Sequence, residues 1–252
     1  MQRSPVIAIK ESWWLPTRID GEEWLDHGHG TPEDIDTSLA DLSRINRWLG
    51  GMRGVRRYLY PRVRACQTAP VRVLDLGAGG CTIPAIVARW ARQESIPLHV
   101  VGLDLHQRHL QWARRHLREW PEITFVQGDV AALPFAEGCV DFVISSLFLH
   151  HFTADTLVQR LPAWASLARR SLIMTDLLRH PLPYWFMRAT SPVFARSSMT
   201  RHDAAVSCRR AYRLHELQGI LAAAGFEQAR VYAHFPYRVV IVIDHPEPGG
   251  SR

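Results

Sequence analysis

The sequence has almost no lysine, and its few cysteines are not placed for a metal site or a disulfide framework. Lys10 is the only lysine among 30 basic residues, so nearly all of the positive charge comes from arginine. The four cysteines, Cys66, Cys81, Cys139 and Cys208, lie far apart and form no CxxC pair. This spacing argues against a disulfide framework and a zinc site. We therefore expect no metal and a reducing, cytoplasmic environment.

Long hydrophobic runs are missing as well. No stretch of about 18 apolar residues occurs, so we expect no segment that crosses a bilayer. The first residues, MQRSPVIAIKESWWLP, lack the long apolar stretch of a signal peptide, which also predicts a cytoplasmic protein. The net charge of +6 is compatible with nucleic-acid binding. Acidic residues are spread along the whole chain, however, and we expect no nucleic-acid partner.

Short apolar runs alternate with helical patterns from residue 71 onward, as in a parallel sheet that is covered on both faces. The expected strands are 71–76, 98–103, 123–127, 140–146 and 171–176. The expected helices between them are 82–93, 106–119 and 153–168. A helix over 213–224 then precedes two apolar runs that are joined only by Pro236 and Tyr237, and so short a link predicts an antiparallel hairpin. The sequence thus predicts a seven-stranded, mostly parallel α/β sheet with a C-terminal antiparallel hairpin.

Two regions do not follow this alternation. The stretch TPED at 31–34 is typical of a helix start, and residues 1–66 are expected to form a helical N-terminal cap or lid. The core is expected at 67–245. It is interrupted at 177–212 by a proline- and aromatic-rich insertion, which we assign to the cap because so long a connection is usually functional. The tail, 246–252, is expected to be disordered.

Glycine and aspartate residues follow the first three strands, where open parallel sheets bind ligands. Gly77 and Gly79 permit a tight turn and the close approach of a ligand, or they form an ordinary strand–helix turn. Asp104 suits both hydroxyls of a ribose, or it caps the next helix. Asp129 suits an exocyclic amine, or it is a solvated turn residue. Together they favour a nucleotide-like ligand, although Thr82 departs from the dinucleotide-binding fingerprint.

Four stretches in order, VLDLGAGG, VVGLDL, FVQGDVAALPF and DFVISSLFLHHF, resemble the successive motifs of class I S-adenosylmethionine (SAM) dependent methyltransferases. The LHH ending is most similar to the branch of ubiquinone/menaquinone and small-molecule methyltransferases. The resemblance covers 71–176 well and 213–244 in outline. It implies a Rossmann-like fold, SAM as cofactor, S-adenosylhomocysteine as product and a small-molecule acceptor.

The resemblance also implies which residues hold SAM. The loop under its methionine moiety would consist of Asp75, Gly77, Ala78 and Gly79. Ser145 would pack near the sulfonium and the carboxylate. Asp104 would hold the ribose and Leu105 would line the adenine, whose amine Asp129 would bind with Val130 beside it. Cys81 departs from the pattern, which often has a third glycine at that position. One of Arg44 and Arg47 could meet the SAM carboxylate, or both remain solvated.

Two adjacent histidines, His150 and His151, are the candidate catalytic bases, because they follow the fourth strand on the ligand side. Adjacent side chains point in different directions, so at most one should face the acceptor; the alternative is packing against or capping helix 153–168. The acceptor pocket is expected to use apolar cap residues, which could instead only close the core. These residues are Trp13, Trp14, Trp24, Tyr184, Trp185, Phe186, Met187 and Phe194.

We therefore predict methyl transfer to a small aromatic or polyketide-like acceptor, as in secondary metabolism, on oxygen rather than carbon. The alternatives are a membrane quinone C-methyltransferase, a SAM-binding partner protein without catalysis, and a nicotinamide-dependent oxidoreductase. The stretch RGVRRYLYPRVR at 53–64 holds five arginines. It could contact a membrane surface, a phosphate or a carrier protein, or it is a solvated helix face. The oligomeric state is not predicted.

Overall fold

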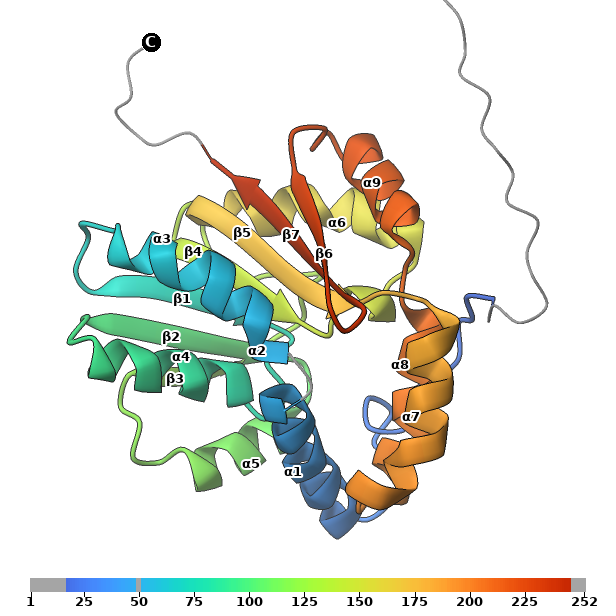
Figure 1. The fold of residues 1–252 in the computed structure, drawn as a ribbon. Helices are drawn as coiled ribbons and strands as arrows, with labels where there is room; N and C mark the ends of the chain where they lie inside the picture. Colours follow the sequence, from blue (N-terminus) through green and yellow to red (C-terminus); the bar gives the residue numbers. More distant parts are fainter. Residues whose placement is uncertain (1–16, 49–50, 246–252) are drawn as a thin grey trace, which may run out of the picture.

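The computed structural model describes residues 17–48 and 51–245, without the side chains of Arg47 and Trp48 (Figure 1). Seven strands form one sheet in the order β3-β2-β1-β4-β5-β7-β6. They are β1 (Val71–Leu76), β2 (Leu98–Asp104), β3 (Ile123–Gln127), β4 (Val140–Ser146), β5 (Ala168–Leu177), β6 (Arg230–His234) and β7 (Arg238–Asp244). Neighbours from β3 to β5 are parallel, whereas β7 is antiparallel to β5 and β6. The predicted α/β fold class is confirmed.

Helices cover both faces of the sheet, as right-handed crossovers between parallel strands require. Helices α4 (Thr82–Gln93) and α5 (Gln107–His116) connect strands that step outward from β1 to β3. Helix α6 (Ala154–Ser166) connects β4 to β5, which step the other way, so it lies on the opposite face with α9 (Leu214–Ala223) (Figure 1). The direction changes between β1 and β4, and open α/β sheets bind their ligands at this switch point.

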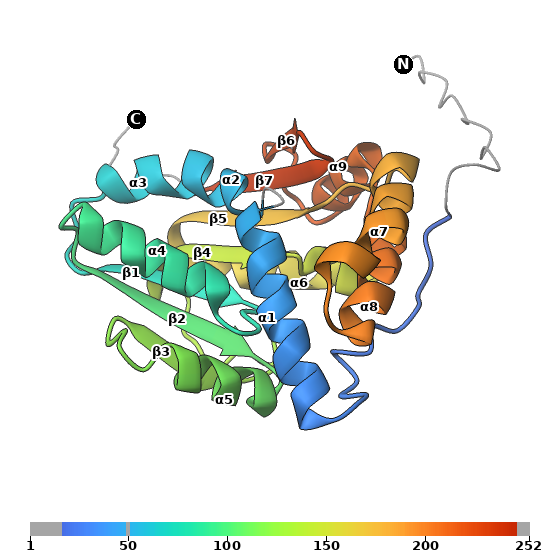
Figure 2. The ribbon, with the colours of Figure 1, turned by 60° about the horizontal axis from the view of Figure 1, so that its bottom comes forward.

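The N-terminal helices divide between the end of the sheet and its face. Helix α1 (Pro32–Trp48) stands at the carboxyl ends of the strands beside α7 (Pro181–Phe194) and α8 (Ser198–Arg210) (Figure 2). Helix α2 (Gly51–Gly54), the π-helical turn η1 (Val55–Leu59) and α3 (Tyr60–Arg64) instead pack on the sheet. Within the described residues, the cap is therefore smaller than the predicted 1–66 and joins α1 to the 177–212 insertion.

Polar contacts join the two parts of this cap. The Ser38 and Thr200 hydroxyls lie 3.0 Å apart, both buried between α1 and α8. The buried Asp41 carboxylate accepts the N–H groups of Arg196 and Ser197 at 2.7 and 2.9 Å. These bonds fix α1 against the insertion, so that both segments close the same end of the sheet.

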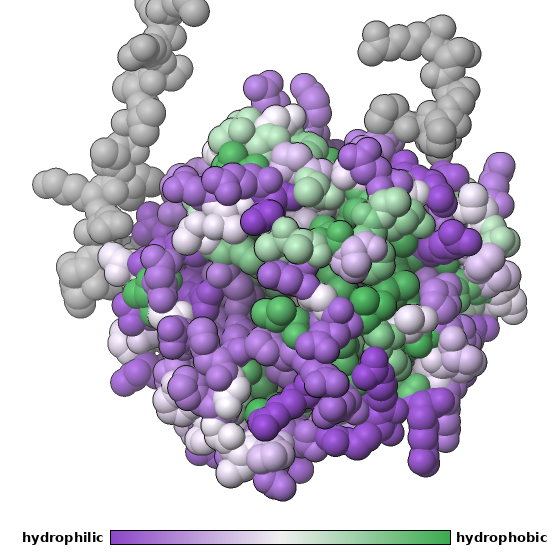
Figure 3. Space-filling view, turned by 180° about the vertical axis from the view of Figure 1, so that it is seen from behind, coloured by the Kyte–Doolittle hydropathy of each residue, from purple (hydrophilic) through white to green (hydrophobic). Residues whose placement is uncertain are grey.

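Two hydrophobic clusters, one on each side of the sheet, form most of the core. One is centred on Trp164 of α6, and the other lies under α3 and α4. Seen from behind, the molecule has a surface of mixed hydropathy, with hydrophobic residues among hydrophilic ones (Figure 3). No helix in the described part of the chain has the length and apolar character needed to cross a bilayer. Two predictions lie outside the described residues. They concern the C-terminal tail, 246–252, and the pair Trp13 and Trp14.

Candidate functional site

A cavity of about 1010 Å³ lies at the carboxyl ends of the central strands, beneath the cap. The two predicted groups of site residues meet in its wall. The first group is Asp75, Gly77, Ala78, Gly79, Asp104, Leu105, Asp129 and Val130. The second group is the histidine pair His150 and His151. Residues up to 76 positions apart in the sequence thus share one chamber, because parallel strands end at the same edge of the sheet.

The loop after β1 exposes main chain to this cavity. Gly77 and Gly79 have φ of +68° and +53°, a region that L side chains rarely adopt. A Cβ on Gly77 would lie 2.3 Å from the ring of Phe148, so glycine is required there by packing as well. A Cβ on Gly79 would meet no atom within 4 Å. The space beside Gly79 is therefore open to a ligand.

Cys81 has the same left-handed backbone conformation as Gly77 and Gly79, with φ of +54°. This explains why the resembling pattern often has glycine at this position, since only glycine adopts it without strain. Cys81 is fully buried, and burial together with the charges of Asp75 and Asp104 raises the pKa of its thiol. The thiol therefore stays protonated at neutral pH and is a poor nucleophile.

Asp75 is a buried acid whose carboxylate has no hydrogen bond to any described residue. Burial, and then the nearby charge of Asp104, raises its pKa well above the usual value. A buried carboxyl group without a partner is costly unless a ligand compensates it. Because Asp75 lines the cavity, its carboxyl group suits a cationic part of a ligand.

The Asp104 carboxylate is held by the residues that follow it and by the glycine loop after β1. Its Oδ2 accepts the Gly79 N–H at 2.7 Å, and its Oδ1 accepts the His106 N–H at 2.9 Å and lies 3.1 Å from Nδ1 of His109. Burial raises the pKa of Asp104, but His109 and the two N–H groups outweigh this and lower it. With about four lone-pair sites, the carboxylate has one left, on Oδ2. This arrangement leaves one acceptor site for a ribose hydroxyl. A second ribose hydroxyl can donate to Asp104 only if it displaces the Gly79 N–H as a donor to Oδ2.

The three residues implied for adenine lie along the cavity wall. Leu105 is 55% exposed, which is unusual for leucine and leaves an apolar surface for a flat ring to cover. Val130 is half-buried beside it in the lining. Asp129 is exposed, and its Oδ1 accepts the Ala131 N–H at 2.8 Å, which is the turn role named as its alternative. Its Oδ2 remains available to a ligand.

The position of Ser145 argues against its predicted role near the sulfonium. Ser145 is buried and does not line the cavity, whereas Ser146 does. Successive side chains of a strand point to opposite faces, so only one of the two serines can face the ligand. Ser146, which accepts a hydrogen bond from Thr175 at 3.1 Å, lines the cavity instead.

His150 is a fully engaged, buried cation rather than a free base. Its Nδ1 lies 2.7 Å from Asp176 Oδ1, its N–H donates to Asp176 Oδ2, and its Nε2 lies 3.3 Å from Glu23 Oε1. Burial lowers its pKa, but the charges and hydrogen bonds of Asp176 and Glu23 raise it to about 10. A histidine that is protonated at neutral pH cannot accept a proton. The prediction of a catalytic base is therefore not supported for His150.

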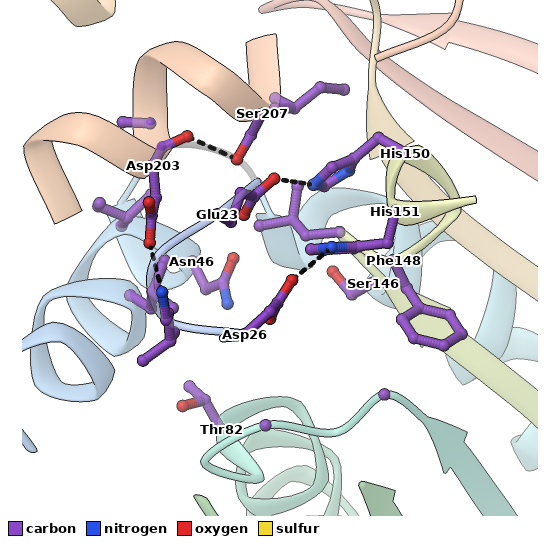
Figure 4. A pocket seen from close by; sticks show the side chains of 18 of the residues that line it. Glu23, Asp26, Asn46, Thr82, Ser146, Phe148, His150, His151, Asp203 and Ser207 are labelled. Carbon is purple, nitrogen blue, oxygen red and sulfur yellow. Dashed lines mark hydrogen bonds and ion pairs between the residues drawn. The ribbon is translucent and has the colours of Figure 1, made fainter. Parts of the chain in front are cut away.

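His151 has the geometry that the base requires. Its Nδ1 lies 2.7 Å from Oδ2 of Asp26, and its side chain is 20% exposed in the cavity wall (Figure 4). Burial raises the pKa of Asp26, but the charge and hydrogen bond of His151, followed by His109 and His106, lower it below its usual range. Asp26 is thus ionised, and it orients the imidazole. The remaining nitrogen, Nε2, has no other partner among the described residues.

Sequence reasoning missed both acids of this cluster, because Glu23 and Asp26 lie in an irregular segment with no periodic pattern. The segment is fixed from α8, where the Asp203 carboxylate accepts the N–H groups of Trp24 and Leu25 at 2.8 and 3.0 Å. Figure 4 shows the two acids meeting the histidine pair across the cavity from Thr82. The one local signal in the sequence is the acidic character of GEEWLD at 21–26, which by itself does not indicate a partner.

Glu23, His150 and His151 each place one potential metal-ligand atom within 4.8 Å of the others. Their charges already compensate one another, since Glu23 pairs with the protonated His150. We assign no metal to this cluster.

The cap contributes fewer of the expected aromatic residues. Phe186 and Met187 line the cavity, whereas Trp24, Tyr184, Trp185 and Phe194 do not. Arg44 is ion-paired with Asp41 and also does not line it. Asn46, two residues before the end of α1, lines the cavity in its place, and its buried Oδ1 has no hydrogen-bond partner among the described residues. Asn46 is therefore better placed than Arg44 for an amino-acid group of a ligand.

The ion pairs of His150 predict a pH-dependent stability. The pKa of His150 is about 10 in the folded protein, against about 6.5 for an unperturbed histidine. Between these values the folded state binds the extra proton, so the free energy of unfolding falls as the pH rises. We expect the Tm, measured by calorimetry, to fall by roughly 5 °C or more from pH 6.5 to 10. His150→Gln should remove much of this slope, whereas His99→Gln, near the start of β2 and outside the cavity lining, should keep it. Equal slopes in both variants would contradict the assignment.

Comparison with known proteins agrees with this geometry. Residues 73–170 match the family model of a methyltransferase domain. This match spans the glycine loop, Asp104, Asp129 and the histidine pair, which are the elements of the cavity described above. Residues 73–170 are therefore a methyltransferase domain, which agrees with the resemblance of their motifs to the class I SAM-dependent methyltransferases.

Curated relatives match this chain over part of their length. A malonyl-[acyl-carrier protein] O-methyltransferase from Legionella pneumophila is 32% identical over 105 residues, which is 40% of this chain and 34% of the relative. The corresponding protein from Xylella fastidiosa is 35% identical over 81 residues, 32% of this chain and 26% of the relative. The matches thus span about a third of the relatives or less.

Solved structures extend the similarity of fold to most of the chain. The CMeT domain of the citrinin polyketide synthase superposes with a TM-score of 0.63 and 15% identity, covering 90% of this chain and 60% of that one. Magnesium protoporphyrin IX methyltransferase from Synechocystis, with S-adenosylhomocysteine bound, superposes with a TM-score of 0.56 and 18% identity. The superposition covers 83% of this chain and 94% of that one. At these identities the likeness concerns the fold.

Proposed function

We propose that this methyltransferase transfers a methyl group from SAM to a hydroxyl group of a small, largely apolar acceptor, with His151 as the base. The observation that carries the proposal is the Asp26–His151 pair, which lines the same cavity as the glycine loop and Asp104. One chamber therefore offers both a cofactor cradle and an oriented imidazole.

The residues of the cradle fit SAM group by group. The open main chain at Gly79 and the unpartnered carboxyl group of Asp75 suit the methionine moiety with its ammonium group. Asp104 retains one acceptor site for a ribose hydroxyl, and the exposed Leu105 offers a surface for adenine. When bound, SAM supplies a methyl group activated by a positively charged sulfur. The protein then has to align the acceptor and exclude water.

The Asp26–His151 pair explains how a hydroxyl acceptor is activated. In the neutral form of His151, its Nδ1–H donates to the Asp26 carboxylate, so Nε2 carries the free lone pair. As the methyl group is transferred, the acceptor hydroxyl gives its proton to Nε2, and Asp26 stabilises the imidazolium that forms. His150 is excluded from this role because Asp176 and Glu23 keep it protonated.

Oxygen is the favoured site of methylation. The curated relatives carry the words O-methyltransferase in their names, and a hydroxyl of pKa near 10 benefits most from a neutral imidazole. The apolar cap residues Phe186 and Met187 suit an aromatic or polyketide-like skeleton.

Titration and product analysis test the proposal directly. Calorimetry should show binding of SAM and none of NAD, and S-adenosylhomocysteine should accumulate with some member of a panel of phenols, enols and malonyl thioesters. Mass spectrometry of the methylated product distinguishes an ether or ester from a new carbon–carbon bond. Binding of SAM without turnover of any panel member would favour a non-catalytic SAM-binding protein. Binding of NAD instead of SAM would reject the proposal.

A further inference from the structure

Helix α7 carries an exposed apolar stripe that covers nothing in the described structure. Leu182, Trp185, Phe186 and Val193 are 59%, 56%, 52% and 88% exposed. Their spacing places them on one side of the helix, within an arc of roughly 100°. Large apolar side chains gathered in this way mark an interaction surface.

The stripe lies at the mouth of the cavity. Leu182 and Phe186 belong to both the stripe and the cavity lining. Phe235, in the turn between β6 and β7, is 78% exposed and also lines the cavity. The three side chains bring α7 and this turn to the same opening, so whatever covers the stripe also faces the acceptor site.

The segments around this mouth carry positive charge and no acid. Residues 51–66, 178–202 and 230–240 contain arginines but no aspartate or glutamate. Arg53 donates to the carbonyl of Phe235 at 2.8 Å, so the arginine-rich helical segment lies next to the mouth. Arg57 and Arg188 are exposed, and neither forms an ion pair with any described residue.

We infer that α7 and the β6–β7 turn seat this methyltransferase on an anionic lipid bilayer, with the cavity opening toward the membrane. Tryptophan and phenylalanine side chains favour the boundary between headgroups and acyl chains, and arginines attract anionic lipids. A convex helix stripe suits such a fluid surface, because it offers no groove for a shaped partner. The acceptor would then be an apolar molecule taken from the bilayer, a part of the inference that rests on the proposed function.

Vesicle flotation tests the membrane contact without SAM or acceptor, so its outcome is independent of activity. The full-length protein should float with vesicles of equal phosphatidylglycerol and phosphatidylcholine, bind phosphatidylcholine alone much less, and be released by about 0.5 M NaCl. Arg57→Gln with Arg188→Gln should weaken binding roughly thirtyfold. Arg89→Gln with Arg118→Gln, which removes the same charge from α4 and the α5 end, should change it little.

Two variants of Trp185 test the stripe itself. Trp185→Glu should abolish flotation with an unchanged Tm, because the residue is exposed. Trp185→Phe should retain flotation but lose part of the fluorescence quenching by brominated lipids. Flotation that is absent in the parent protein, or unaffected by Trp185→Glu, would overturn the inference. So would a dimer that Trp185→Glu dissociates, or binding of an acidic carrier protein to the patch while vesicles fail to bind.

Discussion

His151→Ala is expected to lower kcat by about 10²- to 10⁴-fold for an acceptor of pKa near 10, with no change in the Kd of SAM. The reason is that Asp26 fixes the Nδ1 proton of His151 and leaves Nε2 as the proton acceptor. Stopped-time assays of S-adenosylhomocysteine release give kcat, and calorimetry gives the Kd. His27→Ala is the matched control, because His27 also lines the cavity but has no carboxylate partner among the described residues.

The acceptor pKa provides a readout that a purely structural role of His151 would not affect. A more acidic acceptor ionises without help, so the rate loss in His151→Ala should shrink as the acceptor pKa falls toward the assay pH. Asp26→Asn should show the same trend with a smaller loss, because the imidazole remains but loses its orientation and its counter-charge. A full rate in His151→Ala, or a loss independent of acceptor pKa, would show that alignment alone drives the transfer.

Asp104→Ala is expected to weaken SAM binding by about 1–3 kcal/mol, roughly 5- to 150-fold. The carboxylate has one acceptor site for ribose, and it also holds the Gly79 and His106 N–H groups. Its removal therefore leaves a ribose hydroxyl unpaired and loosens the glycine loop. Calorimetric titration of the variant with SAM measures the effect.

A second variant separates these two contributions. Asp104→Asn keeps a carbonyl oxygen for one N–H but loses the negative charge, so its loss of affinity should be smaller. Asp129→Asn, at the neighbouring strand end, should weaken binding less still, because Asp129 is exposed. An unchanged SAM affinity in Asp104→Ala would remove the ribose assignment.

Local patterns in the sequence predicted the sheet closely. Strands β1, β3 and β4 and helix α4 occupy the predicted residues, and β5 begins three residues earlier than expected. These elements are predicted by continuous apolar runs and by the glycines at which the runs end. Both signals depend only on residues close together in the sequence. The arginine-rich segment 51–64 was harder to place, because a helix of alternating arginine and apolar residues suits either a cap or a sheet face.

By itself, the sequence determined the fold class, the resemblance to the class I SAM-dependent methyltransferases and the strand ends that meet at the cavity. Parallel strands bring their carboxyl ends to one edge, so the order of the motifs was sufficient for this. Only the tertiary structure distinguished between the two histidines. His150 is protonated and His151 is oriented because of acids 127 and 125 residues earlier in the chain, in addition to Asp176. Such long-range charge pairs leave no periodic trace, since they depend on how a loop without regular structure folds over the sheet.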